Sequence, residues 1–167
     1  MSKLIKILFV LKVLPYSIYF NFRYLPFRQA IKLPILIKNP HLIRMRGTVR
    51  LEISDIRFAM VRLGFKNSSI YPLNGITWDN NGTIVFKGKC NIGNDCYLVC
   101  GKQRRIVFGE DFRATAGVKI ISMCSIVFGN NCLVGWGNTI IDSSFHPLYD
   151  IENKYFQKSF NPISFGD

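Results

Sequence analysis

A repeat with a period of six residues constrains the fold of this chain more than any other sequence feature. Large apolar or small residues recur at this spacing in three runs: Ile92 and Leu98; Phe108, Ala114, Ile120 and Ile126; Phe128, Val134 and Ile140. A period of six fits neither an amphipathic helix nor a simple alternating strand. Three six-residue sides that close a turn of about 18 residues are the simplest geometry. The sequence therefore predicts a mainly β solenoid over residues 82–167, with these side chains in its core.

Short corner phrases support the same geometry. An apolar residue followed by glycine and two Asn, Asp or Glu residues begins at positions 92, 108 and 128, and a fourth phrase begins at 165 and meets the chain end. The first two spacings between these phrases are 16 and 20 residues. Their sum is twice the roughly 18 residues expected for one full coil. Glycine tolerates positive φ, and Asn and Asp are good turn formers, so we expect corners here. Because the repeat stops in mid-phrase, three alternatives are open: the chain is a fragment, the gene is truncated, or a partner covers the open end.

Three of the five cysteines also fit the repeat. Cys96, Cys124 and Cys132 fall four residues after large positions, where a small side chain would point inward. Neither a CxxC pair nor the paired spacing of a zinc site is present, so we expect structural cysteines and no metal. An odd number of cysteines and the absence of a signal-peptide cleavage site favour a reducing, cytoplasmic compartment.

Positive charge is concentrated before the repeat. Residues 1–50 contain ten basic residues and no acid, whereas the other 117 residues contain twelve basic and ten acidic residues. We therefore expect a basic, apolar N-terminal arm over 1–50 and an irregular lead-in to the solenoid over 51–81. Pro15 is expected to interrupt any helix in this arm. No uncharged apolar run reaches the roughly 18 residues of a membrane-spanning helix.

The arm has two open interpretations. Aromatic residues are mixed with two arginines over 16–28 and flanked by lysines at 12 and 32, a combination that suits the headgroup layer of an anionic membrane. Residues 1–30 would then place the protein at the inner face of the membrane. Alternatively, the arm packs on the following domain and its lysines are solvated. Single-stranded nucleic acid would use similar side chains, but no RNA-binding signature accompanies them, so no nucleic-acid partner is expected.

The two histidines differ in their surroundings. His41 follows a proline in the arm and is expected to be solvated. His146 stands where the six-residue pattern fails, at the start of a non-repeating segment that lasts until Ile163. Loops that leave a rigid scaffold often carry function. His146 is therefore the candidate catalytic residue.

The repeat resembles the left-handed parallel β-helix of the hexapeptide-repeat acyltransferases. The segment around His146 is similar to an Asp-x-Asp-Phe-His phrase in the O-acetyltransferases of capsule, exopolysaccharide and colanic-acid synthesis: Asp142, Phe145 and His146 match, and Ser144 replaces the second acid. Residues 21–30 also resemble the N-terminal region of such enzymes. The left hand of the coil is implied by this resemblance and not by the period.

The resemblance implies a homotrimer that transfers acetyl from acetyl-CoA to a sugar hydroxyl of a surface-polysaccharide precursor. His146 would be the general base, and Asp142 would fix its tautomer. Trp136, Asn138 and Ser144 would contact the sugar. The residues that bind acetyl-CoA are expected mostly in coils after Asp167, so this chain is expected to be inactive or incomplete by itself.

Two alternatives remain from other classes. A non-catalytic β-helix, acting as a scaffold or a membrane-surface interaction protein, would consume no acetyl-CoA. A γ-class carbonic anhydrase shares the fold type but needs a cluster of zinc-binding histidines, and the chain has only two histidines.

Overall fold

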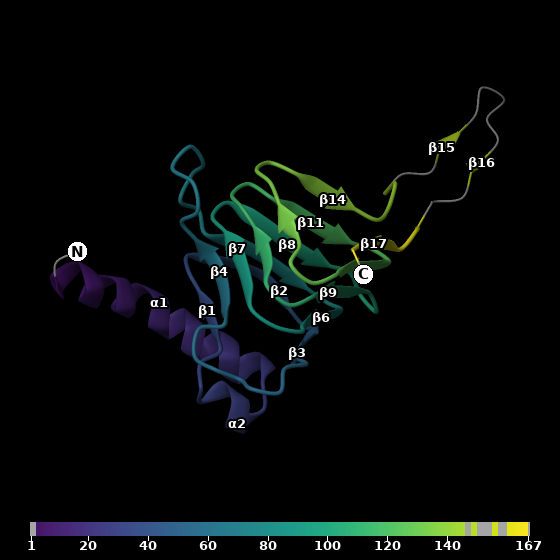
Figure 1. Ribbon diagram of the computed structural model, residues 1–167. Helices are drawn as coiled ribbons and strands as arrows, with labels where there is room; N and C mark the ends of the chain where they lie inside the picture. The colour runs from purple at the N-terminus through teal and green to yellow at the C-terminus, as the bar shows by residue number, and fades with distance from the viewer. Residues whose placement is uncertain (1–2, 146–147, 150–154, 157–159, 167) are drawn as a thin grey trace.

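Three parallel β-sheets form the body of the molecule in a computed structural model (Figure 1). The structure describes residues 3–145, 148–149, 155–156 and 160–166. Each sheet has five strands, and the chain visits the three sheets in turn, so that one circuit makes one coil. This arrangement is a parallel β-helix, which confirms the predicted mainly β solenoid.

We name the sheets A, B and C in the order in which the chain enters them. Sheet A contains β1 (Ile35–Ile37), β4 (Val61–Phe65), β7 (Cys90–Gly93), β10 (Phe112–Ala114) and β13 (Leu133–Val134). Sheet B contains β2 (Pro40–Met45), β5 (Ile76–Asn80), β8 (Cys96–Cys100), β11 (Lys119–Ser122) and β14 (Thr139–Ile141). Sheet C contains β3 (Thr48–Leu51), β6 (Thr83–Phe86), β9 (Arg105–Phe108), β12 (Ser125–Phe128) and β17 (Ile163–Phe165).

In the described part of the chain, four elements lie outside the coils. Helix α1 (Lys3–Tyr24) and the single-turn helix α2 (Phe27–Ala30) precede the first strand and lie at the β1 end of the stack (Figure 1). The short strands β15 (Leu148–Tyr149) and β16 (Tyr155–Phe156) pair antiparallel between β14 and β17. They project from the opposite end of the stack (Figure 1).

The coils begin well before the expected start at residue 82. Strands β1, β2 and all but the last residue of β3 come from the segment expected to be an arm, and β4 and β5 come from the expected lead-in. Residues 52–60 form a loop between the first and second coils, and residues 66–75 form a loop within the second coil. These two insertions hide the period in the sequence. The repeat is therefore legible only where successive strands follow one another through short corners.

The coil length expected from the corner phrases is wrong. Phe86 pairs with Phe108, and Phe108 pairs with Phe128, so each of these coils is longer than three six-residue sides. The phrase at 92 lies at the corner from sheet A to sheet B, whereas those at 108 and 128 lie at the corner from sheet C to sheet A. Spacings between different corners do not measure a coil.

The predicted turn and core positions are largely confirmed. Asp95, Asp111 and Asn131, one in each corner phrase, have φ of 57°, 53° and 57°. The expectation that the glycine of the phrase takes positive φ is wrong for these three phrases. A Cβ on the glycine at 93 or 109 would lie within 2.6 Å of a carbonyl oxygen of the next coil, so these glycines allow close approach of the backbones. All the expected large positions from 92 to 128 are buried, and Val134 and Ile140 in the last coil pack against the same core. Of the three cysteines expected to point inward, Cys96 is buried, while Cys124 and Cys132 are half-buried.

A column of phenylalanines runs through the coils beneath sheet C. The rings of Phe86 and Phe108 stack with their centroids 5.3 Å apart, those of Phe108 and Phe128 at 5.5 Å, and those of Phe128 and Phe165 at 5.2 Å. Phe112, on β10, packs across the column at 4.6 Å from Phe108. Since each coil places its ring on the ring of the coil before it, this column couples neighbouring coils.

Helix α1 is continuous through Pro15, so the expected interruption is wrong. A proline inside a helix costs about 3 kcal/mol because it removes a hydrogen bond and clashes with the preceding turn. Tertiary packing offsets this cost here. Phe20 is fully buried, 4.9 Å from Trp78 of β5, and the indole N–H of Trp78 donates to the Tyr24 hydroxyl at 2.9 Å. The inner face of α1 therefore closes the first coil, as the packed-arm interpretation predicts.

Candidate functional site

The corner from sheet B to sheet C carries a column of buried polar or thiol side chains. Four successive coils contribute Asn80, Cys100, Ser122 and Asp142, each at most 4% exposed. Strand register places Asn80 beside Cys100 and Cys100 beside Ser122. Asp142 follows directly on Ile141, which pairs with Ile121. The column therefore leads through the stack to the point where the chain leaves the regular coil.

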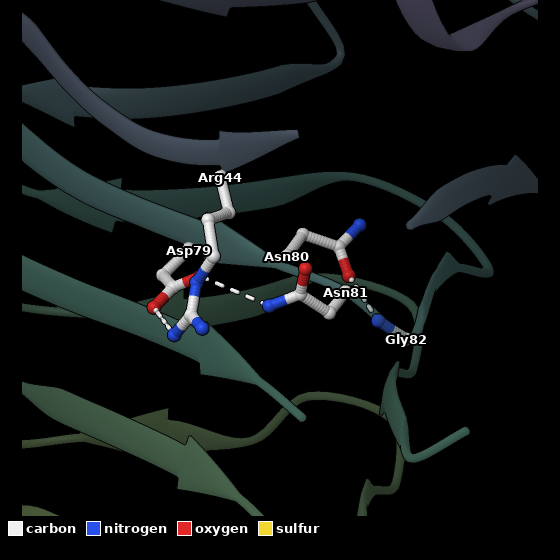
Figure 2. A network of polar contacts seen from close by, with 5 residues as sticks. All are labelled: Arg44, Asp79, Asn80, Asn81 and Gly82. Atoms are coloured by element: carbon white, nitrogen blue, oxygen red, sulfur yellow. Dashed lines mark hydrogen bonds and ion pairs between the residues drawn. The ribbon is translucent and has the colours of Figure 1, made fainter. Parts of the chain in front are cut away.

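The second coil shows how such a corner is held (Figure 2). The Asn80 side-chain oxygen accepts the N–H of Gly82 at 3.0 Å, and its amide nitrogen donates to the Thr48 carbonyl at 3.0 Å. On the other face of the strand, Asp79 accepts two hydrogen bonds from Arg44, at 2.7 Å from Nε and 2.5 Å from Nη2. These hydrogen bonds and the carboxylate charge raise the pKa of Arg44. The inward polar residue thus satisfies backbone groups of the turn.

Asp142 likewise satisfies backbone groups of a turn, through its carboxylate oxygens. Its Oδ1 accepts the N–H of Met123 at 2.5 Å, and its Oδ2 accepts the N–H of Cys124 at 3.0 Å and the Ser122 hydroxyl at 2.8 Å. Hydrogen bonds to an ionised acceptor are stronger than neutral ones. A carboxylate has about four lone-pair positions, so acceptor capacity remains on Oδ1. Asp142 fixes the place from which the following segment departs.

Residues 143–162 form this departing segment, which we call the excursion. An isolated bridge between Ser143 and Phe160 closes its base, and the guanidinium of Arg104 lies 5.9 Å from the Phe160 ring. Phe145 has φ of 58°, which is unusual for a bulky side chain, and its N–H donates to the Ser143 hydroxyl at 3.0 Å. His146, the expected catalytic residue, follows Phe145 and lies outside the described residues.

The expected sugar contacts fall into two groups. Ser144 is exposed at the base of the excursion, two residues after Asp142. Trp136 and Asn138 lie at the sheet A to sheet B corner, and the length of β14 separates them from Asp142, about 13 Å at 3.3 Å per residue. Trp136 is 57% exposed, and Asn138 donates to the Gly135 carbonyl at 3.2 Å. The structure therefore brings Ser144, but neither Trp136 nor Asn138, close to Asp142.

Three cations lie at the same B–C corner, two coils before Asp142. Lys102, Arg104 and Arg105 are exposed in and beside the turn between β8 and β9. Strands of adjacent coils are about 4.8 Å apart, so this turn lies about 10 Å along the stack from the base of the excursion. Such a cluster suits a phosphate group. The sequence did not predict this cation cluster. Residues 102–105 lie far from Asp142 in the sequence and come near it only because the coils stack.

A second feature missed from the sequence is a cleft of about 750 Å³ at the sheet C to sheet A corner, beneath the loop 52–60. Its lining mixes basic and acidic side chains, and two pairs are already formed, Arg57 with Asp55 at 2.6 Å and Arg113 with Asp111 at 3.6 Å. This cleft and the excursion occupy different corners of the coil. His41 is exposed on sheet B, as expected.

Three cysteines belong to the interior. Cys90, Cys96 and Cys100 are buried, and burial raises the pKa of Cys96 and of Cys100 to about 11. A thiol that resists ionisation is a poor nucleophile and a poor metal ligand. Among the described residues, no three His, Cys, Asp or Glu side chains come together in a group that could hold a metal ion. The three buried cysteines therefore act as packing residues.

Comparisons with known proteins find no family model, no curated protein and no solved structure that matches this chain. Within the described part of the chain, no helix combines the length and the apolar character needed to cross a membrane.

Proposed function

We propose that this chain is an O-acetyltransferase of the hexapeptide-repeat type, acting on a sugar hydroxyl of a surface-glycan precursor. The observation that supports it is the base of the excursion. A buried carboxylate, Asp142, fixes the departing chain, and Phe145 takes a positive φ immediately before His146. Unfavourable backbone conformations are retained where surrounding contacts hold them, and they cluster at functional sites. The proposal includes a left-handed coil and a trimer.

His146 would act as general base. A neutral imidazole, whose unperturbed pKa is about 6.5, accepts the proton of the acceptor hydroxyl at neutral pH. The alkoxide oxygen forms a bond to the acetyl carbonyl carbon, and the carbon–sulfur bond of the thioester then breaks. The imidazolium returns its proton to the departing thiolate. Asp142, through the acceptor capacity that remains on Oδ1, would position the imidazole rather than react itself.

Acetyl-CoA would be the acyl donor, and the corner cations fit its phosphates. Lys102 and Arg105 are exposed about 10 Å along the stack from the excursion base, and Arg104 reaches that base through Phe160. In this role the cations would bind and orient the donor. Ser144, at the same base, is the nearest of the expected sugar contacts to Asp142.

The test is acetyl transfer by the full chain. Protein, acetyl-CoA and a panel of nucleotide sugars and capsule-type oligosaccharides are incubated together, and the acetylated sugar is detected by its mass. The sequence alone leads us to expect an inactive or incomplete chain, but the proposal places the general base and donor-binding cations within these 167 residues. We therefore expect transfer by the unsubstituted chain and its loss in His146→Ala, with His41→Ala as the matched histidine control. Circular dichroism checks that each variant is folded. Equal transfer by His146→Ala, or no transfer to any acceptor, would overturn the proposal and favour a non-catalytic β-helix.

A further inference from the structure

The outer face of the two N-terminal helices is an aromatic surface that packing within the chain does not explain. Six large apolar or aromatic side chains on α1, α2 and the residue after α2 are 44–69% exposed: Tyr16, Ile18, Tyr19, Phe22, Phe27 and Ile31. The Phe22 and Phe27 rings meet edge to face at 6.0 Å and join the two helices into one surface. We call these six residues the helical face.

The opposite side of α1 is already occupied. Val13, Ser17, Phe20 and Asn21 are buried against the first coil, with exposed fractions of 2% or less. At 100° per residue, the exposed positions 18, 19 and 22 lie across the helix from these buried positions. The helical face is therefore a second apolar surface on a helix whose inner surface already has its partner. Contiguous exposed apolar patches of this kind mark interaction sites.

Charge identifies the partner. Lys12, Arg23, Arg28 and Lys32 are exposed around the helical face, and the first acidic residue of the chain is Glu52. Within the described residues, none of these four side chains forms an ion pair with a carboxylate. A second copy of the chain laid on this face would bring like charges together. An anionic lipid surface offers the opposite charge across a whole plane, together with an interfacial layer where Tyr and Phe rings are favourable.

We propose that the helical face binds peripherally to the surface of an anionic bilayer, with its rings at the headgroup level and the four cations against lipid phosphates. The coils would then extend from the membrane. This proposal stands on α1 and α2 alone, so it is independent of the proposed acetyl transfer.

The experiment is co-sedimentation of the full chain with vesicles. Vesicles of pure phosphatidylcholine are compared with vesicles in which a third of the lipid is phosphatidylglycerol, at low salt and at 0.5 M salt. We expect binding only to the anionic vesicles, and weaker binding at high salt because salt screens the attraction. Each cation near the surface contributes about 1 kcal/mol, so Arg28→Gln with Lys32→Gln should lower the partition coefficient about 25-fold.

A second variant tests the rings. Tyr19→Ser with Phe22→Ser should also reduce binding at least tenfold, and it leaves the buried side of α1 intact. The matched control, Ile70→Ser with Lys119→Gln, removes an exposed apolar residue in the loop 66–75 and an exposed cation on β11, both outside the helices, and should bind as the unsubstituted chain does.

Three outcomes would overturn the proposal. The first is equal binding to neutral and anionic vesicles, and the second is full binding by both helical-face variants. The third is the absence of binding to any vesicle. In that case the unsubstituted chain and the ring variant are compared by light scattering, for a dimer, and by binding of a single-stranded oligonucleotide. Whether the ring variant loses either property or neither, the membrane proposal is overturned. A dimer would identify a second copy as the occupant, and oligonucleotide binding would identify a nucleic acid.

Discussion

The side chain of Asn21 makes both backbone hydrogen bonds of Ile35. Its Nδ2 donates to the Ile35 carbonyl at 2.6 Å, and its Oδ1 accepts the Ile35 N–H at 3.2 Å. Ile35 lies in β1, the first strand of sheet A, so these groups face the side where no further strand pairs. One turn earlier on α1, the Ser17 hydroxyl accepts the N–H of Ile37 at 3.0 Å. Helix side chains thus take the place of a missing strand and cover an edge that would otherwise bind another chain.

Asn21→Ala should therefore destabilise the protein strongly. The variant leaves a buried N–H and a buried C=O without partners, and each such group costs about 1–3 kcal/mol. We expect the free energy of unfolding to fall by about 2–6 kcal/mol, measured by urea denaturation. Asn74→Ala is the matched control, because Asn74 is exposed and its hydrogen bond joins it to the Asp95 side chain. Equal unfolding free energies for Asn21→Ala and Asn74→Ala would show that water replaces the buried side chain.

The contact between α1 and the edge of β1 is a feature that could not be predicted from the sequence. The inward positions of the later coils were readable because strand and corner alternate there without insertions. The role of α1 was not, because Ser17 and Asn21 are only two polar residues four apart in an aromatic stretch. That spacing places them on one helix face. Their partners are backbone groups of a strand, which have no sequence signature.

Phe108→Ala should weaken the coupling between coils. Phe108 is fully buried and its ring contacts three others, those of Phe86, Phe112 and Phe128. Removal of a buried phenylalanine ring costs about 3–5 kcal/mol, because the lost burial is accompanied by a cavity. We expect a loss in that range in thermal or urea unfolding. Phe58→Ala removes a ring that is 62% exposed, so its effect on stability should be small. Similar losses in both variants would contradict the column as the stabilising feature.

Asp142→Asn should loosen the corner from which the excursion departs. The amide has one acceptor oxygen for the three donors at Ser122, Met123 and Cys124, and its NH2 group would face a backbone N–H. We expect a loss of about 1–3 kcal/mol in unfolding free energy and faster amide hydrogen exchange at Met123 and Cys124. Exchange at these two amides equal to that of the unsubstituted chain would show that the carboxylate does not hold the turn.

The candidate site also contains features that could be predicted from the sequence and features that could not. The failure of the period after His146 correctly located an excursion from the coil, since a break in a repeat needs only the chain itself to be seen. The contacts of Asp142 could not be read, because its partners are residues 122–124 of the previous coil. Trp136 and Asn138 are predicted to lie on the same side of the coil as Asp142, but the extended backbone of β14 separates them from it.

Lys102→Gln combined with Arg105→Gln should weaken donor binding if the chain transfers acetyl groups. Both cations are exposed, so the substitutions should leave the fold intact. Their loss removes charge that pairs with phosphate without touching the reacting atoms. We expect KM for acetyl-CoA to rise about tenfold with kcat within twofold of its original value. The charge-matched control is Lys66→Gln with Lys87→Gln, two exposed cations outside this corner. A fall in kcat at constant KM would place the cations in another role.

The buried thiols should make stability fall at alkaline pH. Burial raises the pKa of Cys96 and Cys100 from an ordinary value near 9 to about 11. Between these values the unfolded chain releases the thiol protons and the folded chain keeps them. The folded state then binds more protons, so stability is complete below pH 9 and decreases as pH rises toward 11. We expect Cys96→Ala combined with Cys100→Ala to lose less stability between pH 8 and pH 10.5 than the unsubstituted chain. Comparison of the two slopes in urea unfolding cancels the titration of Lys and Tyr. Parallel slopes would mean that the two thiols ionise as easily in the folded coil as in the unfolded chain.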